Sequence, residues 1–242
     1  MKHIVGDIHG EISKLRSLVH YIKAFDSDPN FVFIGDYIDK GEDAKTTLDF
    51  LVSLEKDHDC TFLMGNHEYC WLNASSYEEY LLRYGAKNTM DALGLTNLYD
   101  TQKLLLNNYG NFFSSLRHYY LCGSYIITHS GIPPDLYAVE DLDSIDSKCF
   151  LFNRYPFIMQ EVFFQSKYKV IFGHTGFFEP YVDDYKIGID TAACYLESQP
   201  LTSFCIETET FINSERTITE LNAFKKDSCA NIVRTKPWRI ND

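Results

Sequence analysis

Residues 35–41 read Gly-Asp-Tyr-Ile-Asp-Lys-Gly and place two carboxylates and one cation between two glycines. The apolar run at residues 31–34, which precedes them, is typical of a buried strand. Carboxylates that leave a strand end together, in a loop small enough for close backbone approach, suit divalent metal ions. Aspartate and glycine are also ordinary turn residues, so the stretch by itself fits an acidic turn equally well.

Similar polar side chains follow other apolar runs of the chain, and they favour the metal interpretation. The candidate set has eight members, which include four of the eight histidines: Asp7, His9, Asp36, Asp39, Asn66, His67, His129 and His174. Mixed imidazole and carboxylate donors suit manganese, iron, zinc or nickel better than calcium. The set is too large for one ion and fits two ions ~3.5–4 Å apart that share a carboxylate.

Asp36 is the natural bridging ligand, because a carboxylate has two oxygens and this one follows the central strand of the first half. Asp7 and His9, with one residue between them, could bind the first ion. The donors left for the second ion are Asn66, His129 and His174. Asn66 would contribute a neutral amide oxygen, which limits the negative charge of the site.

The first half of the chain predicts elements that bring these side chains together. Apolar runs at residues 2–5, 31–34 and 60–64 predict strands, and apolar residues at helical spacing within 12–25 and 44–54 predict two helices between them. This order predicts a parallel sheet with right-handed crossovers. Because sites form outside the carboxyl ends of parallel strands, the three motifs should converge on one rim.

The second half returns to strands after a helical stretch. The predicted strands lie at residues 124–128, 168–172, 186–190 and 203–208. Residues 71–121 look helical and could form either a cap over the site or a layer packed against the sheet. Residues 213–242 carry six basic and four acidic side chains and predict a strand-poor tail, packed on the domain or partly mobile.

Composition limits the classes of function. The chain has 242 residues and a net charge of −12, which argues against a general nucleic-acid binder because that class needs positive surface for phosphates. The seven cysteines form no Cys-x-x-Cys pair and predict reduced, buried thiols of a cytoplasmic protein. The start of the chain has no signal-peptide pattern, and no apolar run has the length of a membrane span, so we expect no membrane partner.

Three motifs carry a resemblance to a known family: GDIHG at residues 6–10, GDYIDKG at 35–41 and GNHE at 65–68. With HSG at 129–131 and GHT at 173–175, the chain resembles the calcineurin-like metallophosphoesterases, above all short bacterial and phage members of the phosphoprotein phosphatase branch. The resemblance implies an α/β fold, a β-sandwich of two mixed sheets flanked by helices with a βαβαβ core. We expect one domain of this kind at residues 1–212, with a cap-like helical insertion at 71–121, followed by the tail at 213–242.

The resemblance also implies a role for each polar residue. Six would be metal ligands: Asp7, His9, Asp36, Asn66, His129 and His174. A metal-bridging hydroxide would attack phosphorus, and His67 would protonate the leaving oxygen while Asp39 orients its imidazole. Three would bind the substrate phosphate: Arg154, Lys40 and Asn66. We expect two divalent ions, manganese first, with iron, zinc or nickel as alternatives.

The chain departs from the family pattern at two places, and the first of them leaves the substrate open. Lys40 stands where this branch has an arginine, which keeps the charge but loses the planar two-pronged donor. Residues 190–193 lack the glycine that usually follows the threonine. The function expected is a serine/threonine-phosphatase-like phosphoric monoester hydrolase acting on a phosphoprotein or a small phosphometabolite. A symmetrical dinucleoside polyphosphate hydrolase is the nearest alternative, followed by a phosphodiesterase or nuclease and by a non-catalytic phosphate-binding relative.

Overall fold

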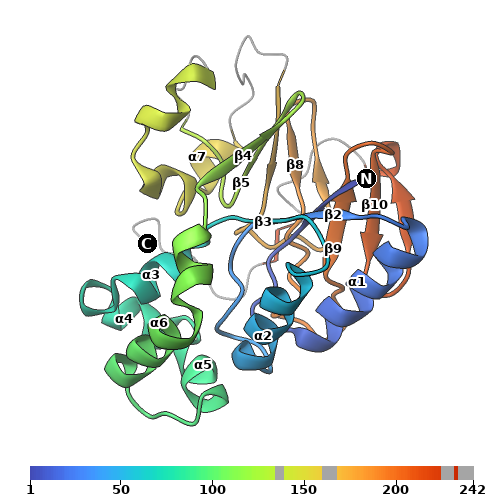
Figure 1. Cartoon of the computed structure of the whole chain (residues 1–242). Coiled ribbons are helices and arrows are strands. Elements are labelled where there is room, and N and C mark those ends of the chain that lie inside the picture. Colours follow the sequence, from blue (N-terminus) through green and yellow to red (C-terminus); the bar gives the residue numbers. More distant parts are fainter. Residues whose placement is uncertain (134–138, 160–167, 225–231, 234–242) are drawn as a thin grey trace.

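The structure is a computed structural model that describes residues 1–133, 139–159, 168–224 and 232–233. Within these residues the chain forms two mixed sheets with helices around them (Figure 1). The six-stranded sheet has the order β11-β10-β9-β1-β2-β3, and the five-stranded sheet has the order β4-β5-β6-β8-β7. The predicted α/β sandwich of two mixed sheets with a βαβαβ core is confirmed.

The strands are β1 (Lys2–Val5), β2 (Asn30–Phe33), β3 (Cys60–Phe62), β4 (Tyr119–Cys122), β5 (Tyr125–Thr128), β6 (Lys169–Phe172), β7 (Tyr181–Val182), β8 (Lys186–Gly188), β9 (Thr202–Cys205), β10 (Thr210–Asn213) and β11 (Ile218–Glu220). The α-helices are α1 (Ile12–Phe25), α2 (Ala44–Leu54), α3 (Asn66–Leu72), α4 (Glu78–Arg83), α5 (Ala86–Ala92), α6 (Leu98–Ser115) and α7 (Tyr155–Ile158). The strands predicted at 60–64, 186–190 and 203–208 end two or three residues early. In the described ranges no helix combines the length and the apolar character that a membrane crossing requires.

The first half of the chain follows the predicted order of strands and helices. β1 pairs in parallel with β2, and β2 pairs in parallel with β3, so their carboxyl ends meet at one edge. α1 buries a single apolar stripe, formed by Ile12, Leu15, Leu18, Val19 and Ile22. α2 begins after Asp43, whose side chain accepts a hydrogen bond from the backbone N–H of Thr46 at 2.9 Å. This cap satisfies one of the N–H groups that the first turn leaves unpaired.

Apolar side chains from both sheets fill the space between them. Ile4 and Val32 come from the six-stranded sheet, and Ile127, Ile171 and Ile187 come from the five-stranded sheet. Each of the five is at most 1% exposed. Burying one such side chain contributes roughly 1.5–3 kcal/mol, so this layer holds in place the strands whose ends carry the predicted motifs.

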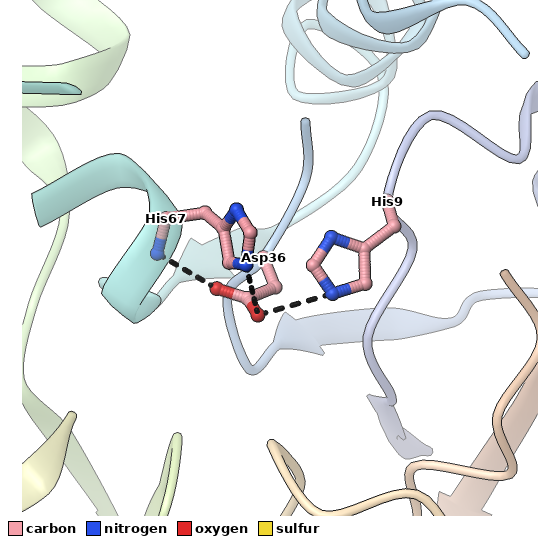
Figure 2. Close-up of side chains that lie close together, drawn as sticks. All are labelled: His9, Asp36 and His67. Atoms are coloured by element: carbon pink, nitrogen blue, oxygen red, sulfur yellow. Dashed lines mark hydrogen bonds and ion pairs between the residues drawn. The ribbon is translucent and has the colours of Figure 1, made fainter. Parts of the chain in front are cut away.

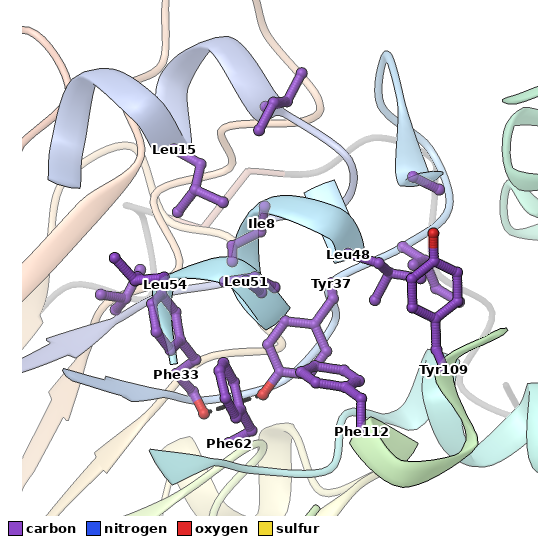
Figure 3. Packing of buried hydrophobic residues seen from close by; sticks show 14 of the residues in the cluster. Ile8, Leu15, Phe33, Tyr37, Leu48, Leu51, Leu54, Phe62, Tyr109 and Phe112 are labelled. Atoms are coloured by element: carbon purple, nitrogen blue, oxygen red, sulfur yellow. Dashed lines mark hydrogen bonds between the residues drawn. The ribbon is translucent and has the colours of Figure 1, made fainter. Parts of the chain in front are cut away.

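A second apolar cluster packs the helical segment, residues 71–121, against the outer face of the six-stranded sheet (Figure 3). Tyr37 lies within it, and its hydroxyl donates to the carbonyl of Leu63 at 2.7 Å. Its ring meets that of Phe112 from α6 edge to face, with 5.3 Å between the centroids. Aromatic pairs of this geometry contribute about 0.5–1.5 kcal/mol beyond their burial. Residues 71–121 therefore pack against the core, and their last residues belong to β4 rather than to a helix.

The prediction of a strand-poor tail is wrong for its first residues. The expected boundary after residue 212 falls inside β10. β10 pairs with β9 and with β11, so this hairpin extends the six-stranded sheet. β11 is an edge strand whose side chains are largely exposed, so its sequence is polar. This polar composition gave no strand signal from which the hairpin could be predicted. Residues 225–231 and 234–242 lie outside the described residues, so the tail prediction remains untested there.

Candidate active site

The loops after β1 and β2 and the start of α3 place two imidazoles around one carboxylate (Figure 2). The Nε2 atom of His9 lies 3.1 Å from Oδ2 of Asp36, and the Nε2 atom of His67 lies 3.9 Å from the same oxygen. The backbone N–H of His67 donates to Oδ1 of Asp36 at 3.1 Å. Both rings therefore point at Asp36, which is 1% exposed.

A second set of donors lies on the other side of Asp36. The Nε2 atom of His129, which follows β5, lies 3.5 Å from Oδ1 of Asp36 and 2.8 Å from the amide oxygen of Asn66. The amide nitrogen of Asn66 donates to the hydroxyl of Tyr80 at 2.8 Å, which turns the amide oxygen toward His129. His174, which follows β6, has its ring centroid 5.0 Å from that of His129.

The polar atoms form two groups that share one residue. Among the described residues, two sets of three side chains have ligand atoms within 4.8 Å of one another: His9 with Asp36 and His67, and Asp36 with His129 and His174. Asp36 belongs to both sets, and every member is buried. A carboxylate with two oxygens can serve both groups at once, so Asp36 lies where a shared ligand could bridge them.

Asp7 lies beside these groups rather than in them. Its two carboxylate oxygens accept hydrogen bonds from the backbone N–H of His174 at 3.0 and 3.2 Å. Burial, together with the nearby carboxylates of Asp190 and Asp36, raises the pKa of Asp7 well above its ordinary value. His67, predicted as the acid, occupies the place in the first group where Asp7 was expected.

Backbone carbonyls determine which nitrogen of each imidazole faces the site. Nδ1 of His9 donates to the carbonyl of Ile38 at 2.9 Å. Nδ1 of His129 makes the same contact with the carbonyl of Ile34, also at 2.9 Å. A proton on Nδ1 leaves a lone pair on Nε2, which is the form that binds a metal ion. Burial lowers the pKa of His129 to about 4, so its ring is neutral near pH 7.

The charges of the site fit divalent cations. Asp7, Asp36 and Asp190 are each at most 3% exposed. Burial by itself raises the pKa of Asp36, but the surrounding imidazoles, that of His129 foremost, lower it well below its ordinary value. Buried negative charge costs several kcal/mol unless positive charge compensates it. Nitrogen and oxygen donors around such a concentration of carboxylates are the ligand chemistry of manganese, iron, zinc or nickel.

Many residues of the site have an unusual backbone conformation. Five of its residues have φ angles between 48° and 70°: His9, Asp36, Asp39, Lys40 and His174. Residues other than glycine seldom adopt this left-handed region. Such conformations cost about 1–3 kcal/mol each and cluster at functional sites, where the surrounding structure holds them. The tight turns at these residues direct their side chains back across the ends of the strands.

Glu68 holds the turn that follows β2. Its carboxylate oxygens accept hydrogen bonds from the backbone N–H groups of Asp36 and Tyr37, both at 2.8 Å. Gly65 is required beside it, because a Cβ there would lie 2.2 Å from the backbone nitrogen of Asp36. Glu68 has no role in the prediction from the sequence, although its place in the GNHE motif is an available signal.

Asp39 contacts His67, the residue predicted from the sequence to be the acid. Nδ1 of His67 and Oδ2 of Asp39 are 2.6 Å apart, and both side chains are almost fully buried. This contact keeps a proton on Nδ1 and leaves Nε2 on the side of Asp36. The imidazole is therefore oriented by one carboxylate while it faces another.

A cavity of about 390 Å³ opens beside these groups. The predicted phosphate-binding cations Lys40 and Arg154 both line it, as does His67. Other parts of its wall come from residues that belong to no sequence motif, among them Tyr80, Arg83, Tyr84, Asn88, Tyr195 and Val233. The helical segment therefore contributes to this wall as well as to the core, and no periodicity or motif signalled these side chains.

Lys40 reaches back to the two groups of donors around Asp36. Its Nζ atom lies 2.7 Å from Nε2 of His9 and 2.9 Å from the hydroxyl of Tyr195. Burial acts to lower the pKa of Lys40, but Tyr195, Cys194 and Asp36 raise it above its ordinary value. The ammonium therefore stays charged and neutralises part of the buried negative charge.

The chain is similar to phosphatases of several kinds. Serine/threonine-protein phosphatase PP1-1 of Saccharomyces cerevisiae is 34% identical over 87 residues, which make up 34% of this chain and 28% of that protein. The crystal structure of a candidate diadenosine tetraphosphatase aligns with a TM-score of 0.60 and 18% identity over 88% of this chain and 91% of that chain. The cold-active protein-tyrosine phosphatase of a Shewanella species aligns with a TM-score of 0.62 and 17% identity over 90% of this chain and 78% of that chain.

These individual likenesses are limited. The match to the yeast protein spans less than a third of its length, and the two structural alignments show the fold alone. The match to a family is much broader, because the family model described as calcineurin-like phosphoesterase covers residues 3–202. That range contains all the strand-end motifs that meet around Asp36. The chain therefore belongs to the calcineurin-like phosphoesterase family, a family of hydrolases that act on phosphoric esters.

Proposed function

We propose that the protein is a dinuclear metal-dependent phosphoric monoester hydrolase, similar in chemistry to serine/threonine phosphatases. The observation that carries this proposal is the carboxylate of Asp36, which two adjacent groups of buried donors share. Two neighbouring ions are a common device of enzymes that hydrolyse phosphoric esters. The His67–Asp39 pair lies beside the same groups, where an acid for the leaving oxygen is needed.

The ligands that we propose are those predicted from the motifs: Asp7, His9, Asp36, Asn66, His129 and His174. When bound, two divalent ions supply Lewis acidity, an activated water nucleophile and positive charge for the phosphoryl oxygens. We favour manganese, and iron, zinc or nickel suit the same mixed donors. The Nε2 atoms of His9 and His129, each turned toward the site by a backbone carbonyl that holds Nδ1, support this ligand set.

His67 supplies the proton that the leaving group requires. As the ester P–O bond breaks, its electron pair remains on the leaving oxygen, and the Nε2–H of His67 transfers its proton there to give the free alcohol. The oxygen of a water molecule forms the new bond to phosphorus, so the second product is inorganic phosphate. Asp39 stabilises the protonated imidazole through Nδ1. General acid catalysis of this kind contributes typically ~10²–10⁴-fold.

Arg154, Lys40 and Asn66 bind the phosphate in this proposal. Both cations line the cavity with Asn66 and His67. A guanidinium can donate two parallel hydrogen bonds to phosphoryl oxygens, whereas an ammonium acts as a point charge. The angular placement of the phosphate therefore depends on Arg154, while Lys40 contributes positive charge close to the Nε2 atom of His9.

The size of the cavity favours a substrate whose phosphorylated part is small enough to be enclosed by it. Its volume of about 390 Å³ lies in the range of small-molecule sites. Three tyrosine rings line it, those of Tyr80, Tyr84 and Tyr195. A small phosphometabolite or a phosphorylated side chain fits these dimensions. A symmetrical dinucleoside polyphosphate is the second candidate substrate, because the aromatic rings offer stacking partners for a base.

We propose that the catalytic unit runs from residue 1 through β11, with residues 71–121 as a partial cap. We also propose that the protein acts in the cytoplasm. The six cysteines in the described residues form no disulfide with one another, as is usual in a reducing compartment. The net charge of −12 argues against nucleic-acid substrates.

The test is a comparison of ester classes with manganese present. We expect phenyl phosphate to be hydrolysed at least about tenfold faster than diphenyl phosphate, a difference of about 1.4 kcal/mol in activation free energy. Phosphopeptides, small phosphometabolites and dinucleoside polyphosphates complete the panel, with chelator-treated protein as the control. A preference for the diester would reject the monoesterase proposal, and a preference for the polyphosphate anhydride would favour the second candidate.

A further inference from the structure

Asp39 contacts two side chains besides His67. Oγ1 of Thr89 donates to its Oδ1 at 2.6 Å and accepts a hydrogen bond from its backbone N–H at 2.9 Å. Nε1 of Trp71 lies within hydrogen-bond distance of both carboxylate oxygens, at 3.0 and 3.2 Å. The side chains of Asp39, His67, Thr89 and Trp71 are each at most 1% exposed. Buried carboxylate oxygens need donors, and Asp39 receives them from α3 and α5.

Thr89 restrains Asp39 at two points. One hydroxyl group holds both the backbone N–H and the carboxylate of the same residue, so the side chain of Asp39 cannot rotate without losing a buried hydrogen bond. Leaving such a group unpaired in the interior is costly. The orientation of the His67 ring depends in turn on Asp39. A chain of contacts therefore runs from α5 through Asp39 to the acid.

The backbone around Asp39 also needs support. Asp39 and the following Lys40 have φ angles of 70° and 60°, so two successive residues stand in the left-handed region. The start of α5 packs directly against this turn, where the N–H of Lys40 donates to the carbonyl of Gly85 at 3.3 Å. A Cβ at Gly85 would lie 2.7 Å from the backbone nitrogen of Lys40. The helical segment is therefore fitted closely to the turn that carries Asp39.

We propose that Thr89, assisted by Trp71, is a positioning residue that fixes Asp39 and through it aims the Nε2–H of His67 at the leaving oxygen. This inference rests on the proposed function, because it assigns a purpose only if His67 is the acid. It gives residues 71–121 a role in the reaction beyond packing and beyond lining the cavity. No motif in the sequence marks Thr89 or Trp71.

Thr89→Val tests the inference, because valine keeps the shape of threonine and removes both hydrogen bonds. We expect kcat for phenyl phosphate to fall by roughly tenfold, within the range seen when supporting hydrogen bonds of a site are removed. KM and bound metal should stay unchanged, and Thr89→Ser should restore most of the rate because it keeps the hydroxyl. Thr47→Val is the matched control, since Thr47 is also fully buried in a helix and its hydroxyl has no hydrogen-bond partner among the described residues.

Two readouts separate positioning from general damage to the fold. An ester with a better leaving group, 4-nitrophenyl phosphate, needs less help from an acid, so Thr89→Val should slow it less than phenyl phosphate. In a His67→Asn background the same substitution should cause no further loss, because the acid that it positions is gone. Equal losses on both esters, additive losses in the double variant, or no recovery with Thr89→Ser would overturn the proposal.

The two proposals fail in different ways. If His67→Asn leaves turnover unchanged, the acid assignment itself is wrong. If His67→Asn abolishes turnover while Thr89→Val does not slow it, only the positioning role of Thr89 is rejected. Should Thr89→Val not fold, Trp71→Phe carries the same test, because it removes the indole donor and keeps an aromatic ring in the core. The expected pattern for Trp71→Phe is the same selective loss on phenyl phosphate.

Discussion

Asp36→Asn is expected to remove metal from both positions and to abolish turnover. Asp36 is the residue that both groups of potential ligands share, and its two oxygens face His9 on one side and His129 on the other. The substitution replaces one charged oxygen with an amide nitrogen that cannot ligate, and it removes one negative charge from the centre. Changes to residues that only support metal ligands already weaken sites by ~10–100-fold, so we expect a loss of metal affinity beyond that range.

Elemental analysis after dialysis measures this effect directly. The wild-type chain should retain two ions, and the Asp36→Asn chain should retain none at the same free metal concentration. Asp57→Asn is the matched control, because Asp57 is an exposed carboxylate outside the site. Two ions per chain in the Asp36→Asn variant would contradict the bridging role of Asp36.

His67→Asn is expected to lower kcat by ~10²–10⁴-fold, the usual contribution of a general acid, while both ions remain bound. The imidazole is held by Asp39 at 2.6 Å, and its Nε2 is 3.9 Å from Asp36. The same geometry places His67 among the potential ligands of the first group. The variant therefore distinguishes an acid from a ligand, because the loss of an acid spares the metal and the loss of a ligand does not.

The measurement pairs kcat with metal content in the same preparation. His20→Asn, at an exposed histidine of α1, controls for the loss of an imidazole elsewhere in the chain. A variant that keeps both metal ions and normal turnover would exclude His67 as the acid. A variant that loses one ion per chain would make His67 a metal ligand instead.

The parallel core and its rim were predictable because their signals are local. Each of the first three strands is an apolar run that ends directly at a polar motif, so the topology of a parallel sheet brings Asp7, Asp36 and Asn66 to one edge. The histidines after β5 and β6 arrive at that rim by the same rule in the second sheet. Short apolar runs and strand-end motifs are therefore sufficient to predict that these side chains reach one rim.

Other features depend on contacts that no local pattern records. Thr89 lies fifty residues from Asp39 and reaches it only because α5 packs on the turn after β2. The relative places of Asp7 and His67 depend on distances of a few ångströms at the ends of β1 and α3, which spacing along the chain cannot determine. The hairpin of β10 and β11 sits at a sheet edge, where exposed polar side chains weaken the usual alternation.

The decisive measurement for a two-metal centre is phosphate release from phenyl phosphate by the chelator-stripped chain as manganese is added in steps. We predict no turnover without metal and a rate that stops rising once two ions are bound per chain. Turnover by the metal-free chain, or full activity with a single ion bound, would contradict the proposal of a two-metal phosphoric monoester hydrolase centred on Asp36.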